Sequence, residues 1–160
     1  MILHLTRMGK DLILQVLTSQ EDAEIFFNGV VLGNGSQSGS DITELGNQLN
    51  EMNITGITAD DTFVNITANL TNSNVAAEYR VTELGVLVRD PVDHSKSLLF
   101  AYGQVDESGA MYMPAAGDYL LETTLVVKVY VGDVRDVSAA ISDSLIYATK
   151  ASFDEHKYDY

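Results

Sequence analysis

The sequence contains no cysteine, no tryptophan and only two prolines among its 160 residues. Because cysteine is absent, the chain has no disulfide, no cysteine-ligated metal and no thiol nucleophile, which suits a protein made in a reducing cytoplasm. A chain of this length fits one compact domain with a real core.

Basic residues are also scarce, with 9 Lys and Arg against 23 Asp and Glu, for a formal net charge of −14. A nucleic acid or an anionic membrane surface would repel such a chain, so we expect neither as a partner. Apolar residues make up 46% of the sequence, which separates it from disordered acidic chains. No apolar run approaches the ~20 residues of a membrane span, and the short apolar start lacks the basic region of a secretory signal.

An amphipathic helix is predicted near the N-terminus. Thr6 can act as its N-cap, and the helix should run to about Leu17. Its apolar stripe is expected to pack on a sheet or on a neighbouring subunit, and it contains Leu5, Met8, Leu12 and Val16.

The rest of the domain is expected to be mainly β-structure. Strand patterns cover residues 24–33, 64–70, 79–88, 98–105 and 120–131, with turn chemistry at residues 89–93 and 106–109. Residues 41–52 carry a weak capping box that Gly46 and Asn47 interrupt, so at most a short helical turn is expected there. The predicted fold class is α+β, with the N-terminal helix packed on a mainly antiparallel β-sheet or sandwich.

The C-terminal part, residues 137–160, is predicted to be a helical exit that follows a domain over residues 1–136. Ala139, Ile146, Phe153 and Tyr160 recur every seven residues, with His156 at an intermediate position. This repeat indicates the start of a stalk whose apolar seam faces partner helices, and a frayed tail is the alternative. The candidate interface residues are Leu5, Met8, Leu12, Val16, Ile146, Phe153, His156 and Tyr160.

No catalytic, cofactor or metal site emerges from the remaining motifs. Gly33-Asn34-Gly35-Ser36 lacks the Gly-Lys-Ser/Thr that a phosphate loop needs, so a plain turn is favoured. Asp90, Asp93 and His94 could suggest a cation or acid–base site, but Pro91 and the polar neighbours favour a solvated hairpin loop. The acid pairs Glu21-Asp22 and Asp60-Asp61 are typical of solubilising surface charge.

A series of short motifs runs along nearly the whole chain. They are Thr6-Arg7-Met8-Gly9-Lys10-Asp11-Leu12, Leu32-Gly33-Asn34-Gly35, Thr71-Asn72-Ser73-Asn74, Glu83-Leu84-Gly85-Val86, Leu99-Phe100-Ala101-Tyr102-Gly103 and Met111-Tyr112-Met113-Pro114. In type and order they resemble the motifs of phage tail-collar fibre proteins, the N-terminal attachment region of tail fibres.

The resemblance implies a structural virion protein of a phage or phage-derived tail particle, not an enzyme, which attaches a trimeric tail fibre to the tail baseplate and needs no cofactor. Its partners would be further copies of itself, baseplate proteins, and a distal fibre shaft or receptor-binding protein. It would be made in the bacterial cytoplasm and reside in the virion tail. The alternatives are a stand-alone baseplate or collar component, or a glycan-binding receptor-recognition protein, which the lack of tryptophan disfavours.

Overall fold

The computed structural model describes residues 2–18, 25–38, 41–60, 62–131 and 145–147, and this part of the chain is mostly β-structure. Its helices are α1 (Arg7–Thr18) and the short 3-10 helix η1 (Glu107–Gly109). Its strands are β1 (Ile2–Leu5), β2 (Ile25–Gly33), β3 (Gln48–Ala59), β4 (Phe63–Thr71), β5 (Tyr79–Val81), β6 (Glu83–Arg89), β7 (Ser97–Gln104), β8 (Met111–Met113), β9 (Glu122–Tyr130) and β10 (Leu145–Tyr147).

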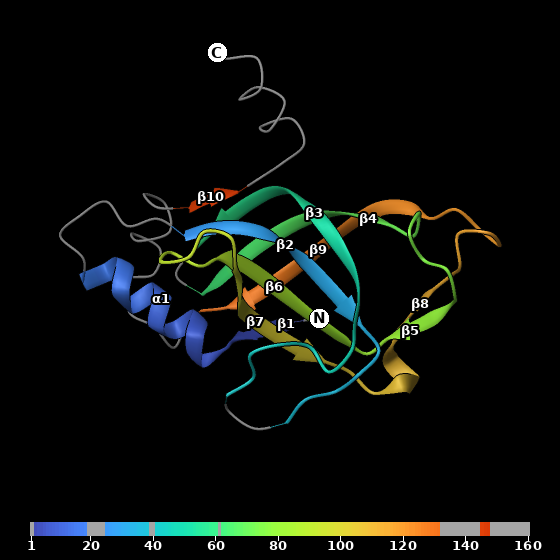
Figure 1. Cartoon of the computed structure of the whole chain (residues 1–160), viewed down its shortest axis with the longest axis horizontal. Helices are drawn as coiled ribbons and strands as arrows, with labels where there is room; N and C mark the ends of the chain where they lie inside the picture. Colours follow the sequence, from blue (N-terminus) through green and yellow to red (C-terminus); the bar gives the residue numbers. More distant parts are fainter. Residues whose placement is uncertain (1, 19–24, 39–40, 61, 132–144, 148–160) are drawn as a thin grey trace, which may run out of the picture.

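Seven of these strands form a closed barrel (Figure 1). They lie in the order β2-β3-β4-β9-β1-β7-β6, and β6 pairs back with β2 to complete the circle. Each neighbouring pair is antiparallel except β1 and β9, which run parallel. Strand β10 lies outside this circle and pairs in parallel with the beginning of β2.

Alternation of apolar and polar residues determines which side chains fill the barrel, because every second side chain of a strand faces its interior. Val64, Ile66, Ala68 and Leu70 are buried along β4, whereas Asn65, Thr67 and Asn69 face outward. At the centre, the rings of Phe27 and Phe100 meet edge to face with their centroids 5.2 Å apart. The core is therefore continuous from wall to wall.

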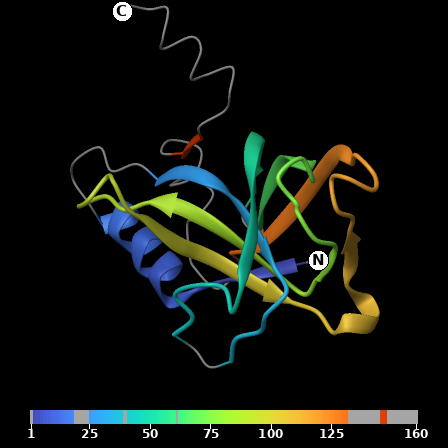
Figure 2. The same cartoon turned by 45° about the vertical axis from the view of Figure 1, so that its right-hand side comes forward.

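The two ends of the barrel are covered by different elements, which lie at opposite ends in both Figure 1 and Figure 2. Helix α1 covers one end and inserts Leu12 and Ile13 into the main core. The small β5–β8 sheet covers the other end with Tyr79, Val81 and Met113.

Thr6 and Gly9 fix the helix on the barrel. The Thr6 hydroxyl accepts a hydrogen bond from the Gly9 N–H at 3.0 Å, which is an N-cap, and donates one to the Leu99 carbonyl at 2.5 Å. A Cβ on Gly9 would lie only 2.1 Å from the Phe100 carbonyl oxygen, so only glycine allows this close approach. The Thr-x-x-Gly motif therefore holds the start of helix α1 against strand β7.

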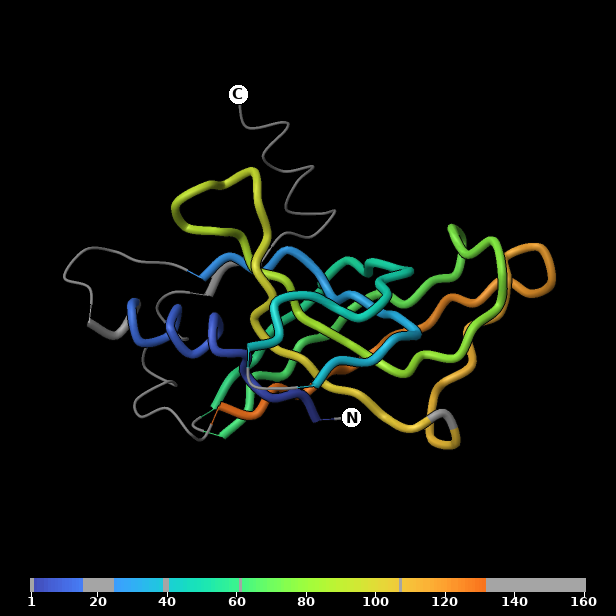
Figure 3. Tube along the Cα trace, turned by 60° about the horizontal axis from the view of Figure 1, so that its bottom comes forward, coloured from blue at the N-terminus to red at the C-terminus, as the bar shows by residue number. Residues whose placement is uncertain are grey.

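A second, smaller core lies on the outside of the barrel. The connection between β2 and β3 folds back over the wall (Figure 3, cyan) and packs Ile42 and Leu45 against Val31, Leu99 and Tyr102. The outer face of this part of the wall is therefore covered by the chain itself.

The predicted helix is confirmed, but the predicted fold class is wrong. We expected an α+β protein with a helix on a sheet or sandwich, and the described residues form a mostly β closed barrel with one short α-helix. Residues 48–52, predicted to form at most a helical turn, begin strand β3. The predicted helical exit is also wrong where it is described, because Leu145–Tyr147 is a strand that pairs with Ile25, Phe26 and Phe27.

Candidate functional site around Glu83

The most concentrated polar site of the described chain surrounds Glu83, the first residue of β6. Its side chain is fully buried, which is rare for a carboxylate. One oxygen accepts hydrogen bonds from the N–H groups of Gly35 and Asn47 at 2.9 and 2.7 Å. The other accepts from the Gly46 N–H at 2.7 Å and the Tyr102 hydroxyl at 2.9 Å. The carboxylate therefore binds both ends of the β2–β3 connection to the barrel.

Glycines make this arrangement possible. A Cβ on Gly33 would lie 2.6 Å from a Glu83 carboxylate oxygen and 2.2 Å from the Asn47 carbonyl oxygen. A Cβ on Gly35 or Gly46 would lie 2.6 Å from backbone atoms of the facing segment. The Gly-x-Gly turn does present backbone N–H groups to an anion, as glycine-rich loops do. The anion is the protein's own carboxylate, which supports the sequence-based interpretation as a plain turn rather than a phosphate loop.

Tyr102 completes the site from β7. Its pKa is raised, first because burial disfavours the phenolate and second because its hydroxyl donates to the Glu83 carboxylate. The same hydroxyl lies 3.1 Å from the Gln104 amide oxygen, which accepts from the Gln37 N–H at 3.1 Å. Tyr102 thus remains a neutral donor and extends the network along the connection.

A second buried polar anchor is Asn72, which is fully buried after β4. Its amide nitrogen donates to the carbonyls of Pro114 and Tyr119, at 2.9 and 2.5 Å, and its amide oxygen accepts from the Leu121 N–H at 2.7 Å. Every hydrogen-bonding group of this side chain is directed at one segment, residues 114–121. Asn72 therefore shapes the approach to β9.

A third anchor is the hydrogen bond from the Tyr79 hydroxyl to the Asn50 side chain at the β5–β8 end. Burial raises the pKa of Tyr79 to about 12. The unfolded chain therefore loses this proton at lower pH than the folded chain, so the free energy of unfolding is expected to fall as pH rises above about 10 and to keep falling until about 12. Urea unfolding across this alkaline range measures the effect, and a Tyr79→Phe chain should show a shallower fall.

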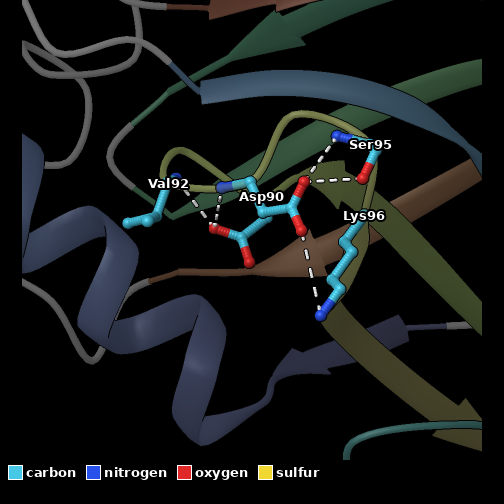
Figure 4. A network of polar contacts seen from close by, with 5 residues as sticks. Asp90, Val92, Ser95 and Lys96 are labelled. Atoms are coloured by element: carbon cyan, nitrogen blue, oxygen red, sulfur yellow. Dashed lines mark hydrogen bonds and ion pairs between the residues drawn. The ribbon is translucent and has the colours of Figure 1, made fainter.

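The loop between β6 and β7 contains the predicted cation candidates. Asp90 accepts from the Val92 and Asp93 N–H groups, and Asp93 accepts from the Ser95 N–H and hydroxyl at 3.1 and 2.6 Å (Figure 4). The hydroxyl bond from Ser95 is the main reason that the Asp93 pKa is lowered. Both carboxylates are occupied by their own loop, and no three His, Asp or Glu side chains among the described residues are grouped so as to hold a metal ion. The predicted hairpin loop is present, since these residues connect β6 to β7.

Replacing Asp93 and His94 together by alanine is expected to change the free energy of unfolding by no more than about 0.5 kcal/mol, because both residues belong to an exposed loop. Thermal unfolding with and without added divalent cations measures this. A large loss of stability, or melting that depends on the cation, would reverse the assignment.

The structure places only some of the predicted interface residues in contact. Leu5 and Leu12 are buried in the main core, so they serve the fold, and Met8 is 37% exposed. Ile146 lies opposite Phe26 in the β10–β2 pair. The side chains of Val16 and Ile146, and the whole of Phe153, His156 and Tyr160, lie outside what the structure describes, as do Glu21, Asp22 and Asp61.

Of the predicted acid pairs, Asp60 is described. It caps the β3–β4 turn by accepting hydrogen bonds from the Thr62 and Phe63 N–H groups at 2.8 Å.

A polar hollow of about 650 Å³ adjoins the Glu83 site, between the start of the β2–β3 connection and η1. Its lining includes the side chains of Asn34, Ser36, Gln104 and Asp106. Among the described lining side chains Asp106 is the only titratable group, so they contain no acid–base pair.

The outer surface of β3, β4, β9 and β1 forms a wall of a different kind, which we call the neutral wall. We define it by the outward residues Ile2, His4, Asn53, Thr58, Phe63, Asn65, Thr67, Asn69, Thr124, Val126, Lys128 and Tyr130. The Tyr130 ring lies 5.8 Å from both the His4 and Phe63 rings. In a chain of net charge −14, these residues carry a single charge, that of Lys128, and the outward carboxylates of the same strands lie next to the wall, Glu51 on β3 and Glu122 opposite Thr71 at the start of β9.

The fold and these sites define a small closed-barrel domain whose buried polar side chains fasten its own loops. Comparison with protein-family models, with curated proteins and with solved structures finds no match for the chain. None of the described helices is long and apolar enough to cross a membrane.

Proposed function

We propose that the chain is a structural connector, the domain that attaches a trimeric phage-type tail fibre to a tail baseplate. The proposal rests on the resemblance of its ordered motifs to phage tail-collar fibre proteins. One structural observation supports it: residues from several separate motifs, Thr6, Gly9, Asn72, Glu83 and Tyr102, fasten helix, loops and barrel together. A connector under mechanical load needs a rigid frame, and these motif residues provide one.

The neutral wall supports the proposed self-association. Copies that each carry a net charge of −14 repel one another, and like charges brought together at an interface cost several kcal/mol. A wall of threonine, asparagine and aromatic side chains reduces this repulsion, with Glu51 and Glu122 as the carboxylates beside it on the same strands. We therefore propose that copies meet through the neutral wall.

Light scattering tests the oligomer, with an expected mass of about 52 kDa for three chains of 17.4 kDa each. Thr67→Glu combined with Asn69→Glu places carboxylates in the centre of the wall and is expected to yield monomers. Val92→Glu combined with Asn74→Glu adds the same charge to exposed loops and should leave the trimer intact. A wild-type monomer at high concentration contradicts self-association.

Immunogold electron microscopy of tail particles from the producing bacterium tests the location. Label at the junction of fibre and baseplate supports the connector, whereas label on the baseplate of fibreless particles favours a stand-alone baseplate component. Unlabelled particles, or turnover of a bacterial polysaccharide by the purified chain, would contradict the proposal.

A further inference from the structure

The barrel wall has a gap where β1 is shorter than its neighbours. Strand β9 pairs with β4 along its whole length, from Glu122 to Tyr130, but with β1 only from Lys128 to Tyr130. On its other side, β1 pairs with β7 only at Ala101 and Tyr102. Among the residues that the structure describes, no strand pairs with the β1-side edge of β9 between Glu122 and Val127.

An apolar slot opens at this gap. It has a volume of about 290 Å³, and the side chains around it include Leu3, Leu84, Val105, Met111, Leu125 and Val127. None of the described residues that line it is charged. The slot leads from the surface toward the barrel core, since Leu3, Leu84 and Val127 belong to that core.

Large apolar side chains are also exposed beside the open edge. Val126 is 54% exposed, and Leu120, just before β9, is 73% exposed. An unpaired strand edge next to exposed apolar residues is a template for another strand, which natural proteins normally cover or charge. Here the uncovered stretch from Thr123 to Val127 contains no charged residue.

We infer that this gap binds an extended apolar segment of a partner chain, which adds a strand to the edge of β9. The unpaired backbone N–H and C=O groups of β9 select an extended backbone. Every second side chain of the added strand would enter the slot, so apolar residues are required at alternate positions. Two exposed carboxylates adjoin the edge and the slot along the chain, Glu122 at the start of β9 and Asp106 directly after the lining residue Val105, and they favour lysine or arginine beside the apolar core of the segment.

The inference does not depend on the proposed tail-fibre function, because only the edge, the slot and the flanking charges carry it. A short peptide in which valine alternates with threonine, with a lysine at each end, is a suitable probe. The control peptide has proline in place of each threonine, because proline cannot donate to the edge. Hydrogen–deuterium exchange of the full chain is measured alone and with each peptide.

The edge-facing amides between residues 122 and 127 are expected to exchange rapidly in the free chain and to become protected by the first peptide alone. Leu125→Lys places a charge in the slot and is expected to weaken peptide binding at least about tenfold in fluorescence anisotropy, since burial of an apolar side chain is lost. Leu49→Lys, at a leucine on β3 that is 45% exposed, is the matched control and should bind as wild type.

Thermal unfolding of both variants checks that they remain folded. Edge amides that are already protected in the free chain would overturn the inference, because the chain then covers its own edge. It would equally be overturned if neither peptide protects the edge, or if both protect it to the same degree.

Discussion

Replacing Glu83 by alanine is expected to lower the free energy of unfolding by at least about 3 kcal/mol, because three backbone N–H groups lose their acceptor. Each buried donor left without a partner costs about 1–3 kcal/mol. Since native domains are stable by only about 5–15 kcal/mol, the loss is a large part of the total. The β2–β3 connection should also detach, which exposes the small outer core of Leu45 and Leu99.

Urea unfolding gives the free energy, and exchange of the Gly35, Gly46 and Asn47 amides reports the loop directly. Glu51→Ala is the matched control, since Glu51 is exposed on β3, and it should be nearly silent. Glu83→Gln should be intermediate, because an amide oxygen still accepts while its NH₂ group faces other donors. An alanine variant as stable as wild type, with unchanged loop amides, is incompatible with the anchoring role.

The second large effect concerns Gly9, where alanine is expected to destabilise the protein by several kcal/mol. Helix propensity alone predicts the opposite sign, because alanine in a helix interior is favoured over glycine by about 1 kcal/mol. The added Cβ would lie 2.1 Å from the Phe100 carbonyl oxygen, which belongs to the backbone of β7 and cannot move alone. Helix α1 must then lift from the barrel end, and Ile13 leaves the core.

Gly117→Ala is the control for Gly9→Ala, because a Cβ on Gly117 meets no atom within 4 Å. Differential scanning calorimetry of both variants should show a much lower melting temperature for Gly9→Ala alone. A Gly9→Ala protein that melts at or above the wild-type temperature would show that propensity outweighs contact at this position.

Local patterns of the sequence predicted individual elements well. The apolar stripe near Thr6 predicted helix α1, alternation predicted β4 and β9, and an apolar run between turn signals predicted β7. Strand β3 was missed because Gly46 and Asn47 suggested a broken helix, although Asn50, Met52 and Ile54 alternate with exposed residues. The alternation typical of a strand was therefore present in the sequence, but the glycine and asparagine of the preceding loop led to a different interpretation.

Closure of the barrel was not predictable from local patterns. It depends on Leu3 pairing with Val129 and on Val30 pairing with Val86, contacts between distant segments that periodicity does not encode. The expected sheet and the observed barrel have the same alternation along each strand, so the pattern could not separate them. The C-terminal heptad pattern likewise did not reveal that Leu145–Tyr147 adds to β2.

The sequence predicted only part of the role of Glu83. The resemblance singled out Glu83-Leu84-Gly85 as a motif, and an acid at the start of an otherwise apolar strand is a signal of its own. Its partners are backbone N–H groups of residues 35, 46 and 47, which any residue type except proline offers. The sequence can therefore indicate that a buried carboxylate is present, but it does not show which backbone N–H groups bind it.

The position of β1 in the wall also determines the order in which the protein can fold. Strand β1 is the first of the described strands to be synthesised. Its neighbours in the barrel are β7 and β9, and Ile2 lies opposite Lys128. On the ribosome, β1 must therefore wait as an unpaired apolar segment until almost the whole described domain has been made. Contacts of such high sequence separation form slowly and expose folding intermediates to aggregation. We expect the yield of native protein to depend on translation speed and on chaperones that hold the N-terminal segment until β9 appears.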